Sequence, residues 1–246
     1  MEKADNGAVM KKSLVSSIGI LMLGLGATTQ AALVDRGNGM IYDSDQGLTW
    51  LQDTNYAMTS GYDADGFTNW HQAVAWADGL NFGGYDDWRL PTVVDIGTPG
   101  ENWSYSGTDA GYNVDTSSEL AYMFHINLGN ESYYNTNGSW NADGCAFNSP
   151  LCLLNMSADG VDILNLLPAA YWSGTEDALD NTRAWFFGTN YGMQSTLGKY
   201  SESLSWAVRD GDVGATTVPV PGTLVLMLSG LAGLGIMQRK QTLLRQ

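Results

Sequence analysis

The stretch that is most informative about the fold is Gly83-Gly84-Tyr85-Asp86-Asp87-Trp88-Arg89-Leu90-Pro91-Thr92. Its two glycines permit positive φ angles and a close approach of chain segments. Pro91 fixes its own φ and favours an extended conformation at the residue before it. Arg89 lies close to Asp86 and Asp87, so the sequence predicts a local ion pair or a bidentate hydrogen bond. Such a combination is typical of a structural element, and we predict that it braces the fold.

The charge balance is strongly acidic, with a formal net charge of −15 although only 15% of the residues are charged. Residues 1–31 hold three lysines and two acids, and residues 222–246 hold three cations and no acid. The 5 basic and 24 acidic side chains between these ends give a net charge of −19. Nucleic acid is not expected as a partner, because its binding relies on clusters of Lys and Arg. The abundant glycines and aromatic residues favour a loop-rich extracellular domain with an aromatic core.

The N-terminal segment has the form of a secretory signal peptide. Two lysines precede the apolar run Leu14–Ala27, and Ala31 supplies the small residue of a cleavage site. We predict that residues 1–31 are removed, with cleavage after Ala32 as the alternative. Met10 is the expected start, because the acidic residues before it do not fit the basic end of a signal peptide.

The C-terminal segment combines a proline motif, an apolar run and a basic end. We divide it into a linker and motif at 214–222, an apolar helix at 223–238 and a basic tail at 239–246. The apolar run is short for a membrane span, which takes about 20 residues. Its basic flank fits a cytoplasmic end. A segment that is inserted and then processed therefore fits better than a permanent anchor. The motif and flank residues are Pro219, Pro221, Arg239 and Lys240.

This C-terminal segment resembles a PEP-CTERM sorting signal in its VPLPA-like variant, with Val220 in place of the central Glu of the commonest form. The resemblance implies an exosortase and the secretion machinery as partners. It also implies transient anchoring in the membrane by the apolar helix and a final location at the cell surface or outside the cell. Proteins of this class are often associated with exopolysaccharide and biofilm.

Three regions carry clear local signals of secondary structure. Residues 39–51 predict a β-hairpin, because two apolar runs flank an Asp/Gly turn. Residues 69–79 predict a helix that begins with a capping box of Asn69 and Gln72. Residues 116–129 predict a second helix, whose expected capping box is Thr116-Ser117-Ser118-Glu119.

The remaining chain is richer in Gly, Asn, Ser and Asp. We expect a loop at residues 96–114 and an irregular segment at residues 131–165. Four short aromatic or β-branched runs between residues 170 and 209 predict an antiparallel meander.

Two acidic turns, at residues 43–47 and 63–66, resemble parts of calcium-binding loops, but both lack the Gly and Glu positions of an EF-hand. We interpret them as turns, and we assign no cofactor and no metal, since no motif supports calcium. Cys145 and Cys152 are the two cysteines of the chain. In a secreted protein they are expected to form a disulfide.

The central region resembles the Lcl C-terminal domain family, named after a collagen-like adhesin, over residues 32–213. The matching pieces occur in the family's order and include Trp-Arg-Leu-Pro-Thr, Trp-Ser-Gly-Thr-Glu and Trp-Ala-Val-Arg-Asp-Gly. The resemblance implies an α+β, C-type-lectin-like fold, as in the formylglycine-generating enzyme, with two helices and an aromatic-rich antiparallel meander. For the adhesin itself, the implied activity is glycosaminoglycan binding. The motif residues, to which we assign a structural role, are Trp88, Arg89, Pro91, Trp172, Glu176, Trp185, Trp206 and Arg209.

The sequence contains little that indicates an enzyme. His71 and His125 are the two histidines, and both fall on predicted helices without metal-ligand spacing. No nucleophile elbow accompanies them. We therefore assign no catalytic residue.

We predict a secreted or cell-surface binding module, with extracellular polysaccharide or matrix as the expected ligand. The motif tryptophans are expected in the core, because large aromatic side chains dominate protein cores. Aromatic residues outside the motifs are the better ligand candidates. The alternative is a structural biofilm-matrix protein without a discrete ligand. The candidate ligand-binding residues are Tyr133, Tyr134, Trp140 and Tyr191.

Overall fold

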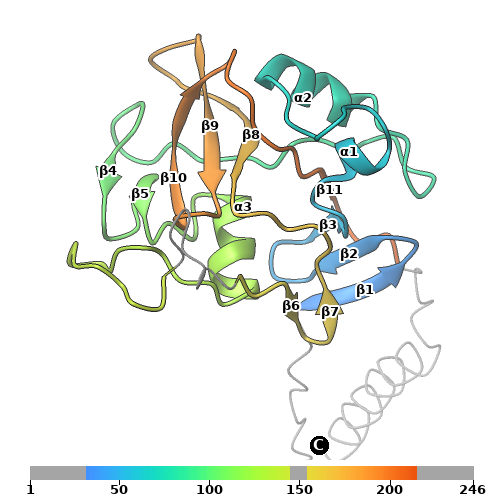
Figure 1. Ribbon diagram of the computed structural model, residues 1–246, viewed down its shortest axis with the longest axis horizontal. Coiled ribbons are helices and arrows are strands. Elements are labelled where there is room, and N and C mark those ends of the chain that lie inside the picture. Colours follow the sequence, from blue (N-terminus) through green and yellow to red (C-terminus); the bar gives the residue numbers. More distant parts are fainter. Residues whose placement is uncertain (1–31, 145–153, 215–246) are drawn as a thin grey trace, which may run out of the picture. The chain divides into compact units, whose positions relative to one another are not determined.

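The computed structural model describes residues 32–144 and 154–214 (Figure 1). Within these residues the chain is mostly β-structure with a few short helices. No helix in the described ranges is long and apolar enough to cross a membrane. The predicted signal peptide, disulfide and sorting segment lie outside the description; the residues concerned are Met10, Ala31, Cys145, Cys152, Pro219, Pro221, Arg239 and Lys240.

The first sheet consists of antiparallel strands in the order β1-β2-β3-β11. The bounds are β1 Leu33–Gly37, β2 Met40–Asp43, β3 Leu48–Leu51 and β11 Val208–Asp210. The predicted hairpin at residues 39–51 is confirmed as β2 and β3. Its turn is closed by the fully buried Asp43, whose carboxylate accepts from the backbone N–H of Asp45 and Gln46 at 3.0 and 3.1 Å. Asp43 is therefore a turn residue, as the sequence predicted.

The second sheet has the order β4-β5-β10-β9-β8, and in Figure 1 these strands lie side by side from β4 to β8. All pairs are antiparallel except β4 and β5, which are parallel. A separate two-stranded ribbon joins β6 to β7. The bounds are β4 Trp103–Ser104, β5 Ala110–Tyr112, β6 Ser157–Ala158, β7 Val161–Asp162, β8 Ala170–Glu176, β9 Arg183–Gly188 and β10 Met193–Gly198.

Three sequence expectations about the sheets are corrected. The segment 131–165 was expected to be irregular, but it contains the paired strands β6 and β7. The segment 96–114 was expected to be a loop, but it contains β4 and β5, which extend the second sheet. The predicted meander ends with β10, because the fourth run pairs with β3 in the first sheet. The reason is a crossover at Leu204–Val208. Leu204 bonds to the backbone of β8, whereas Val208 pairs with Trp50 of β3.

The helices are α1 (Tyr56–Thr59), α2 (Trp70–Asp78) and α3 (Glu119–Tyr122), and α3 continues as the π-helical turn η1 (Met123–Asn127). The capping box predicted for α2 is confirmed. The Asn69 side chain accepts from the N–H of Gln72, and the Gln72 side chain accepts from the N–H of Asn69, both at 3.1 Å.

The core is built around tryptophan side chains that are almost completely buried. Trp50 and Trp206 pack with their ring centroids 4.8 Å apart. Four indole N–H groups also donate to backbone carbonyls, and three of the acceptors, all except that of Trp88, lie in distant segments of the chain. These bonds are Trp70 to Ser173 at 2.8 Å, Trp88 to Phe82 at 3.2 Å, Trp172 to Thr68 at 2.9 Å and Trp206 to Leu51 at 2.6 Å.

The parallel pairing of β4 with β5 requires a glycine at position 111. Gly111 has φ +95°, and a Cβ atom there would lie 1.9 Å from the carbonyl oxygen of Ser104. We expect Gly111→Ala to lower the free energy of unfolding by about 3 kcal/mol, because it combines backbone strain with a backbone clash. The matched control is Gly47→Ala, where φ is +69° but the space is open. There the expected loss is only about 1 kcal/mol. Urea denaturation measures the free energy of unfolding of both variants. Equal losses in Gly111→Ala and Gly47→Ala would contradict the close approach of Gly111 to the backbone of Ser104.

Candidate functional site

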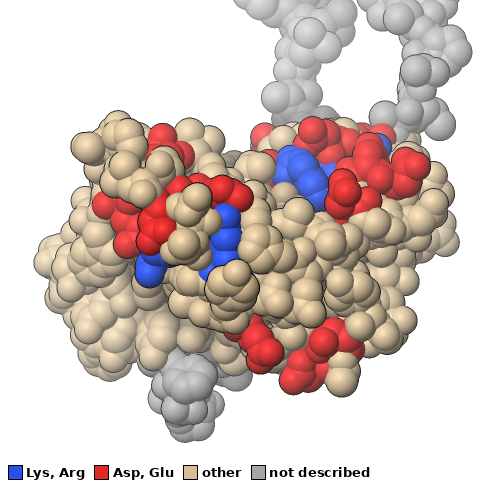
Figure 2. Space-filling view, turned by 90° about the horizontal axis from the view of Figure 1, so that it is seen from above, with Lys and Arg blue, Asp and Glu red and all other residues tan. Residues whose placement is uncertain are grey.

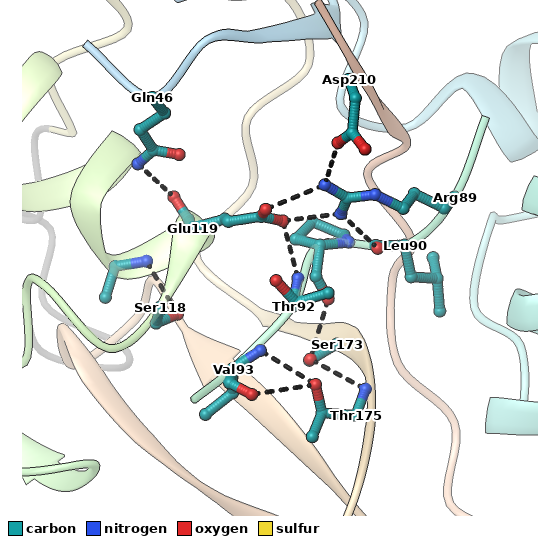
Figure 3. Close-up of polar contacts among 12 residues, drawn as sticks. Gln46, Arg89, Leu90, Thr92, Val93, Ser118, Glu119, Ser173, Thr175 and Asp210 are labelled. Carbon is teal, nitrogen blue, oxygen red and sulfur yellow. Dashed lines mark hydrogen bonds and ion pairs between the residues drawn. The ribbon is translucent and has the colours of Figure 1, made fainter. Parts of the chain in front are cut away.

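The guanidinium of Arg89 joins three segments of the chain (Figure 3). It bonds both oxygens of Glu119 on α3, at 2.8 and 2.9 Å, and Asp210 on β11 at 2.6 Å. The backbone of Arg89 also pairs with Val208, the first residue of β11. Burial lowers the pKa of Arg89, but the bonds to Glu119 and Asp210 outweigh this and raise the pKa above its ordinary value. Arg89 therefore stays charged and binds as a bidentate fork.

Glu119 has a role that its sequence context does not reveal. Its Oε2 also accepts from the N–H of Thr92 at 2.7 Å, and its carbonyl accepts from the side chain of Gln46 at 3.2 Å. The predicted capping box starting at Thr116 is wrong. The N-cap is Ser118, whose hydroxyl accepts from the N–H of Ala121 at 3.2 Å. Glu119 is the first residue of α3, so its carboxylate is directed to Arg89 instead of to the cap.

The predicted local pairing of Arg89 with Asp86 or Asp87 is also wrong. Asp87 binds Arg209 at 2.6 and 2.8 Å, while Arg89 binds Asp210. The two segments run antiparallel through the Arg89–Val208 bridge, so each arginine meets a carboxylate of the other segment. The result is a reciprocal brace between the Trp-Arg-Leu-Pro-Thr segment and β11.

The same segment also holds the bulged end of β8. The carbonyl of Pro91 accepts from the hydroxyl of Ser173 and from the N–H of Gly174, both at 2.8 Å. The hydroxyl of Thr175 accepts from the N–H of Val93 at 2.9 Å. Figure 3 shows these contacts directly below the Arg89 brace. The motif pieces Trp-Arg-Leu-Pro-Thr, Trp-Ser-Gly-Thr-Glu and Trp-Ala-Val-Arg-Asp-Gly therefore meet in one place.

The other motif residues lie in the scaffold. Glu176 forms an ion pair with Lys199 at 2.8 Å. Arg183 on β9 donates to the hydroxyl and carbonyl of Thr196 at 2.8 and 2.6 Å. The tryptophans are at most 2% exposed, so none of them presents a ring to solvent; they are Trp88, Trp172, Trp185 and Trp206.

Six aromatic side chains form a continuous cluster near the β4–β5 edge of the second sheet. We call them the tyrosine cluster: Trp103, Tyr105, Tyr112, Tyr133, Tyr134 and Tyr191. Tyr105 and Tyr112 are stacked, with centroids 5.7 Å apart and an interplanar angle of 10°. The other contacts are edge-to-face, with centroid distances from 4.8 to 5.9 Å. Edge-to-face and offset contacts of this kind are the favoured arrangements of aromatic rings.

The cluster is assembled from segments that are far apart in sequence. The side chain of Asn113 donates to the carbonyls of Tyr105 and Tyr134 at 2.8 and 2.9 Å. The N–H of Tyr133 donates to the carbonyl of Tyr191 in the β9–β10 turn at 2.8 Å. Trp140, which is 62% exposed, bridges to the backbone of Tyr134 and flanks the cluster. The loops therefore hold the rings in fixed positions.

The cluster presents aromatic rings and free hydroxyls to solvent. Trp103 is 49% exposed, and four of the tyrosines are half-buried. None of the five tyrosyl hydroxyls has a hydrogen-bond partner among the described residues. Burial, followed by its neighbours Tyr134 and Tyr105, raises the pKa of Tyr112 to about 12. Tyr112 is consequently uncharged at neutral pH.

Three of the four ligand candidates from the sequence belong to this cluster, and Trp140 lies at its border. Trp103, Tyr105 and Tyr112 were not among the predicted ligand candidates, because residues 96–114 were expected to form a loop. The available signal was the run of aromatic residues at positions 103, 105 and 112 in a segment otherwise rich in Gly, Ser and Asp.

A cleft with a volume of about 380 Å³ lies beside Glu119. Hydroxyl groups of Thr92, Thr116 and Ser117 line it, together with the carboxylate of Asp115 and apolar side chains. Its lining contains no histidine, cysteine, lysine or arginine. Glu119 itself is engaged by Arg89.

His125 and Ser132 are near each other but are not arranged as a catalytic pair. The imidazole bonds the carbonyl of Asn130 through Nδ1 at 2.9 Å, and its Nε2 lies 3.4 Å from the hydroxyl of Ser132. That hydroxyl is buried and donates to the carbonyl of Gly192 at 2.6 Å. The serine proton is therefore directed away from the histidine. The pair fixes the loop that carries Tyr133.

Within residues 32–144 and 154–214, no group of three or more His, Cys, Asp and Glu side chains is placed to hold a metal ion. Like Asp43, Asp63 closes a turn, because its carboxylate accepts from the N–H groups of Asp65 and Gly66 at 3.1 and 3.0 Å.

Comparison with known proteins identified one family. The model of the Lcl C-terminal domain matches residues 39–209 of the chain. This range includes Arg89 and Glu119, the motif tryptophans and the whole tyrosine cluster, and it ends one residue before Asp210. No curated protein matches the chain, and no solved structure matches it.

Arg89→Lys tests the brace, because it retains the charge but removes the fork that binds Glu119 and Asp210 together. We expect it to lower the free energy of unfolding by about 2 kcal/mol, and Arg89→Ala to lower it by more, since Ala leaves both carboxylates unpaired. Urea denaturation monitored by tryptophan fluorescence measures both variants. An Arg89→Ala protein as stable as the parent chain would contradict a structural role.

His125 predicts a dependence of stability on pH. Burial lowers the pKa of His125 and outweighs the opposing effects of the Asn130 carbonyl and the carboxylates of Asp115 and Glu131. The unfolded chain therefore binds a proton at a higher pH than the folded chain. Stability should fall as the pH drops below about 6.5, the ordinary value for histidine.

The variant His125→Asn keeps a donor for the Asn130 carbonyl and removes the titrating ring. We expect it to lose less stability than the parent chain between about pH 7.5 and pH 5. The control His71→Asn changes the other histidine, which is exposed. It should follow the parent chain. The measurement is the urea midpoint of each variant at both pH values. If His125→Asn loses as much stability between them as the parent chain does, His125 is not the source of the pH dependence.

Proposed function

Because the chain belongs to the Lcl C-terminal domain family, we propose that it is a non-enzymatic binding module that attaches to extracellular polysaccharide through the tyrosine cluster. The family assignment suggests an adhesin-like surface module. Polysaccharide as the ligand, and the absence of catalysis, are our proposals. So is the closer assignment of the fold to the C-type-lectin-like group.

The observation that carries the proposal is the composition of the tyrosine cluster. Sugar rings have apolar C–H faces that pack on aromatic rings, and hydroxyl groups that exchange hydrogen bonds with neighbours. Tyrosine provides both properties in one rigid side chain. Trp103 is 49% exposed beside five tyrosines with free hydroxyls, and Trp140 is 62% exposed at the border. Exposed aromatic groups held in fixed positions are typical of binding surfaces.

The scaffold supports a binding role because its own polar and aromatic side chains are engaged inside the domain and are not part of the tyrosine cluster. The motif tryptophans are buried in the core. The brace of Arg89, Glu119 and Asp210 is satisfied internally. Reactive groups that approach one another, such as His125 and Ser132, have their protons directed to backbone carbonyls. These features favour a binding module over an enzyme.

We also propose the route of export. The signal peptide at 1–31 would direct secretion, and the segment at 214–246 would be recognised by an exosortase after transient anchoring in the membrane. The protein would then act at the cell surface or in the surrounding matrix. The proposal is supported by the residue patterns at both ends of the chain.

The test is binding of the full chain to a set of insoluble and soluble extracellular polysaccharides. We expect Trp103→Ala to weaken binding about tenfold, because an exposed aromatic anchor in the surface is lost. The control is Tyr200→Ala, which removes another exposed aromatic side chain at the opposite end of β10 from Tyr191. It should bind as the parent chain does. Thermal unfolding verifies that each variant is folded.

The alternative of a structural matrix protein makes a different prediction. If the folded chain binds no polysaccharide, yet its deletion alters biofilm architecture, the protein acts as a matrix component without a discrete ligand. Binding that Trp103→Ala leaves unchanged would place the ligand elsewhere on the surface.

A further inference from the structure

Every Lys and Arg side chain in residues 32–144 and 154–214 is bound to another part of the protein. Arg183 bonds Thr196, and the other four cations form ion pairs. On the face shown in Figure 2, the Lys and Arg atoms lie directly against Asp and Glu atoms. The pairs are Arg36–Asp212 at 2.6 Å, Arg89–Glu119 at 2.8 Å, Lys199–Glu176 at 2.8 Å and Arg209–Asp87 at 2.6 Å.

The nearest charges along the chain to the tyrosine cluster are negative. Glu101 lies two residues before Trp103, and its carboxylate bonds the hydroxyl of Ser195 on β10. Glu131 lies two residues before Tyr133, and its carboxylate accepts from the side chain of Asn141 at 3.3 Å. Both glutamates are exposed. Cluster residues are therefore flanked along the chain by carboxylates, and the cations of the described residues are engaged in the scaffold.

The side-chain amides next to the cluster are already engaged in hydrogen bonds within the protein. The side-chain N–H groups of Asn113 donate to the carbonyls of Tyr105 and Tyr134. The side chain of Asn141 donates to Glu131 and to the carbonyl of Ser132. These amides hold the loops, and the tyrosyl hydroxyls and the indole N–H of Trp103 remain for a ligand. Hydroxyls suit the hydroxyl and acetamide groups of sugars, whereas sulfates and carboxylates are bound most strongly by charged donors.

We propose that the tyrosine cluster binds polysaccharides without sulfate or carboxylate groups and rejects acidic polysaccharides, an inference that rests on the proposed function. When an acidic polymer binds to this surface, its anionic groups lose hydration, and no Lys or Arg of the cluster pairs with them, so binding costs free energy. The polymer would also be repelled by Glu101 and Glu131 and by the net charge of the domain. Within a distance of about 8 Å, physiological salt does not screen this repulsion fully.

The experiment compares polymers of matched size on the full chain at about 0.15 M salt, where surface repulsion is still significant. The uncharged probes are a neutral glucan and oligomers of N-acetylglucosamine, and the acidic probes are heparin and alginate. We expect at least one uncharged probe to bind, with about tenfold weaker binding in Trp103→Ala. Neither acidic probe should bind.

A charge substitution at the border sharpens the test. Glu131→Lys places a cation beside the cluster, and we expect heparin binding to rise severalfold while binding of the uncharged probe changes less than about twofold. The matched control is Glu202→Lys, which makes the same change in net charge at an exposed position after β10, at the opposite end of this strand from Tyr191. It should not raise heparin binding.

The possible results separate this inference from the function on which it rests. Binding of no probe overturns the proposed function and the inference together. Heparin or alginate binding by the parent chain that Trp103→Ala abolishes overturns the inference alone, because polysaccharide binding would stand. Equal gains of heparin binding in Glu131→Lys and Glu202→Lys would also count against it, since the discrimination would then not arise at the cluster.

Discussion

The structure depends on one interaction above all, the fork of Arg89 on Glu119 and Asp210. It connects the segment before Pro91, the start of α3 and the last strand of the first sheet. The backbone of Arg89 pairs with β11 at the same point. Because a guanidinium presents several donors in a fixed plane, one side chain fixes the relative positions of three segments. In a chain with so much irregular structure, such a brace replaces the long ladders that a larger sheet would offer.

The core extends the same principle to the rest of the domain. Buried tryptophans fill the interior. The indole N–H groups of Trp70, Trp172 and Trp206 each bind a backbone carbonyl of a distant segment, and that of Trp88 binds the nearby carbonyl of Phe82. Each of these side chains provides apolar area and one directional bond. The loops are thus attached to the core at defined points.

The few Lys and Arg side chains of the domain are used in the scaffold, which leaves the surface acidic. Because Lys and Arg are engaged by carboxylates or by Thr196, the remaining acids determine the electrostatic character of the exterior. The tyrosine cluster is an uncharged surface within an acidic domain. Its chemistry favours partners that offer apolar faces and hydroxyl groups, and the surrounding charge disfavours polyanions.

The sequence by itself determined the features whose contacts are local. The capping box of α2 and the turns at Asp43 and Asp63 are closed by bonds within three residues, so the residue types predict them. The β2–β3 hairpin and the family's motif pieces were predicted for the same reason, from short runs of residues.

Only the tertiary structure decided the contacts that span long distances along the chain. Arg89 does not bind the adjacent aspartates but binds Glu119 and Asp210, which lie 30 and 121 positions away along the chain. The carboxylate of Glu119 therefore serves Arg89, and Ser118 caps α3. The tyrosine cluster joins residues 103 to 191 through loops that have no periodic pattern. Their arrangement depends on Gly111, Asn113 and the β9–β10 turn together, and no single stretch of the sequence contains that information.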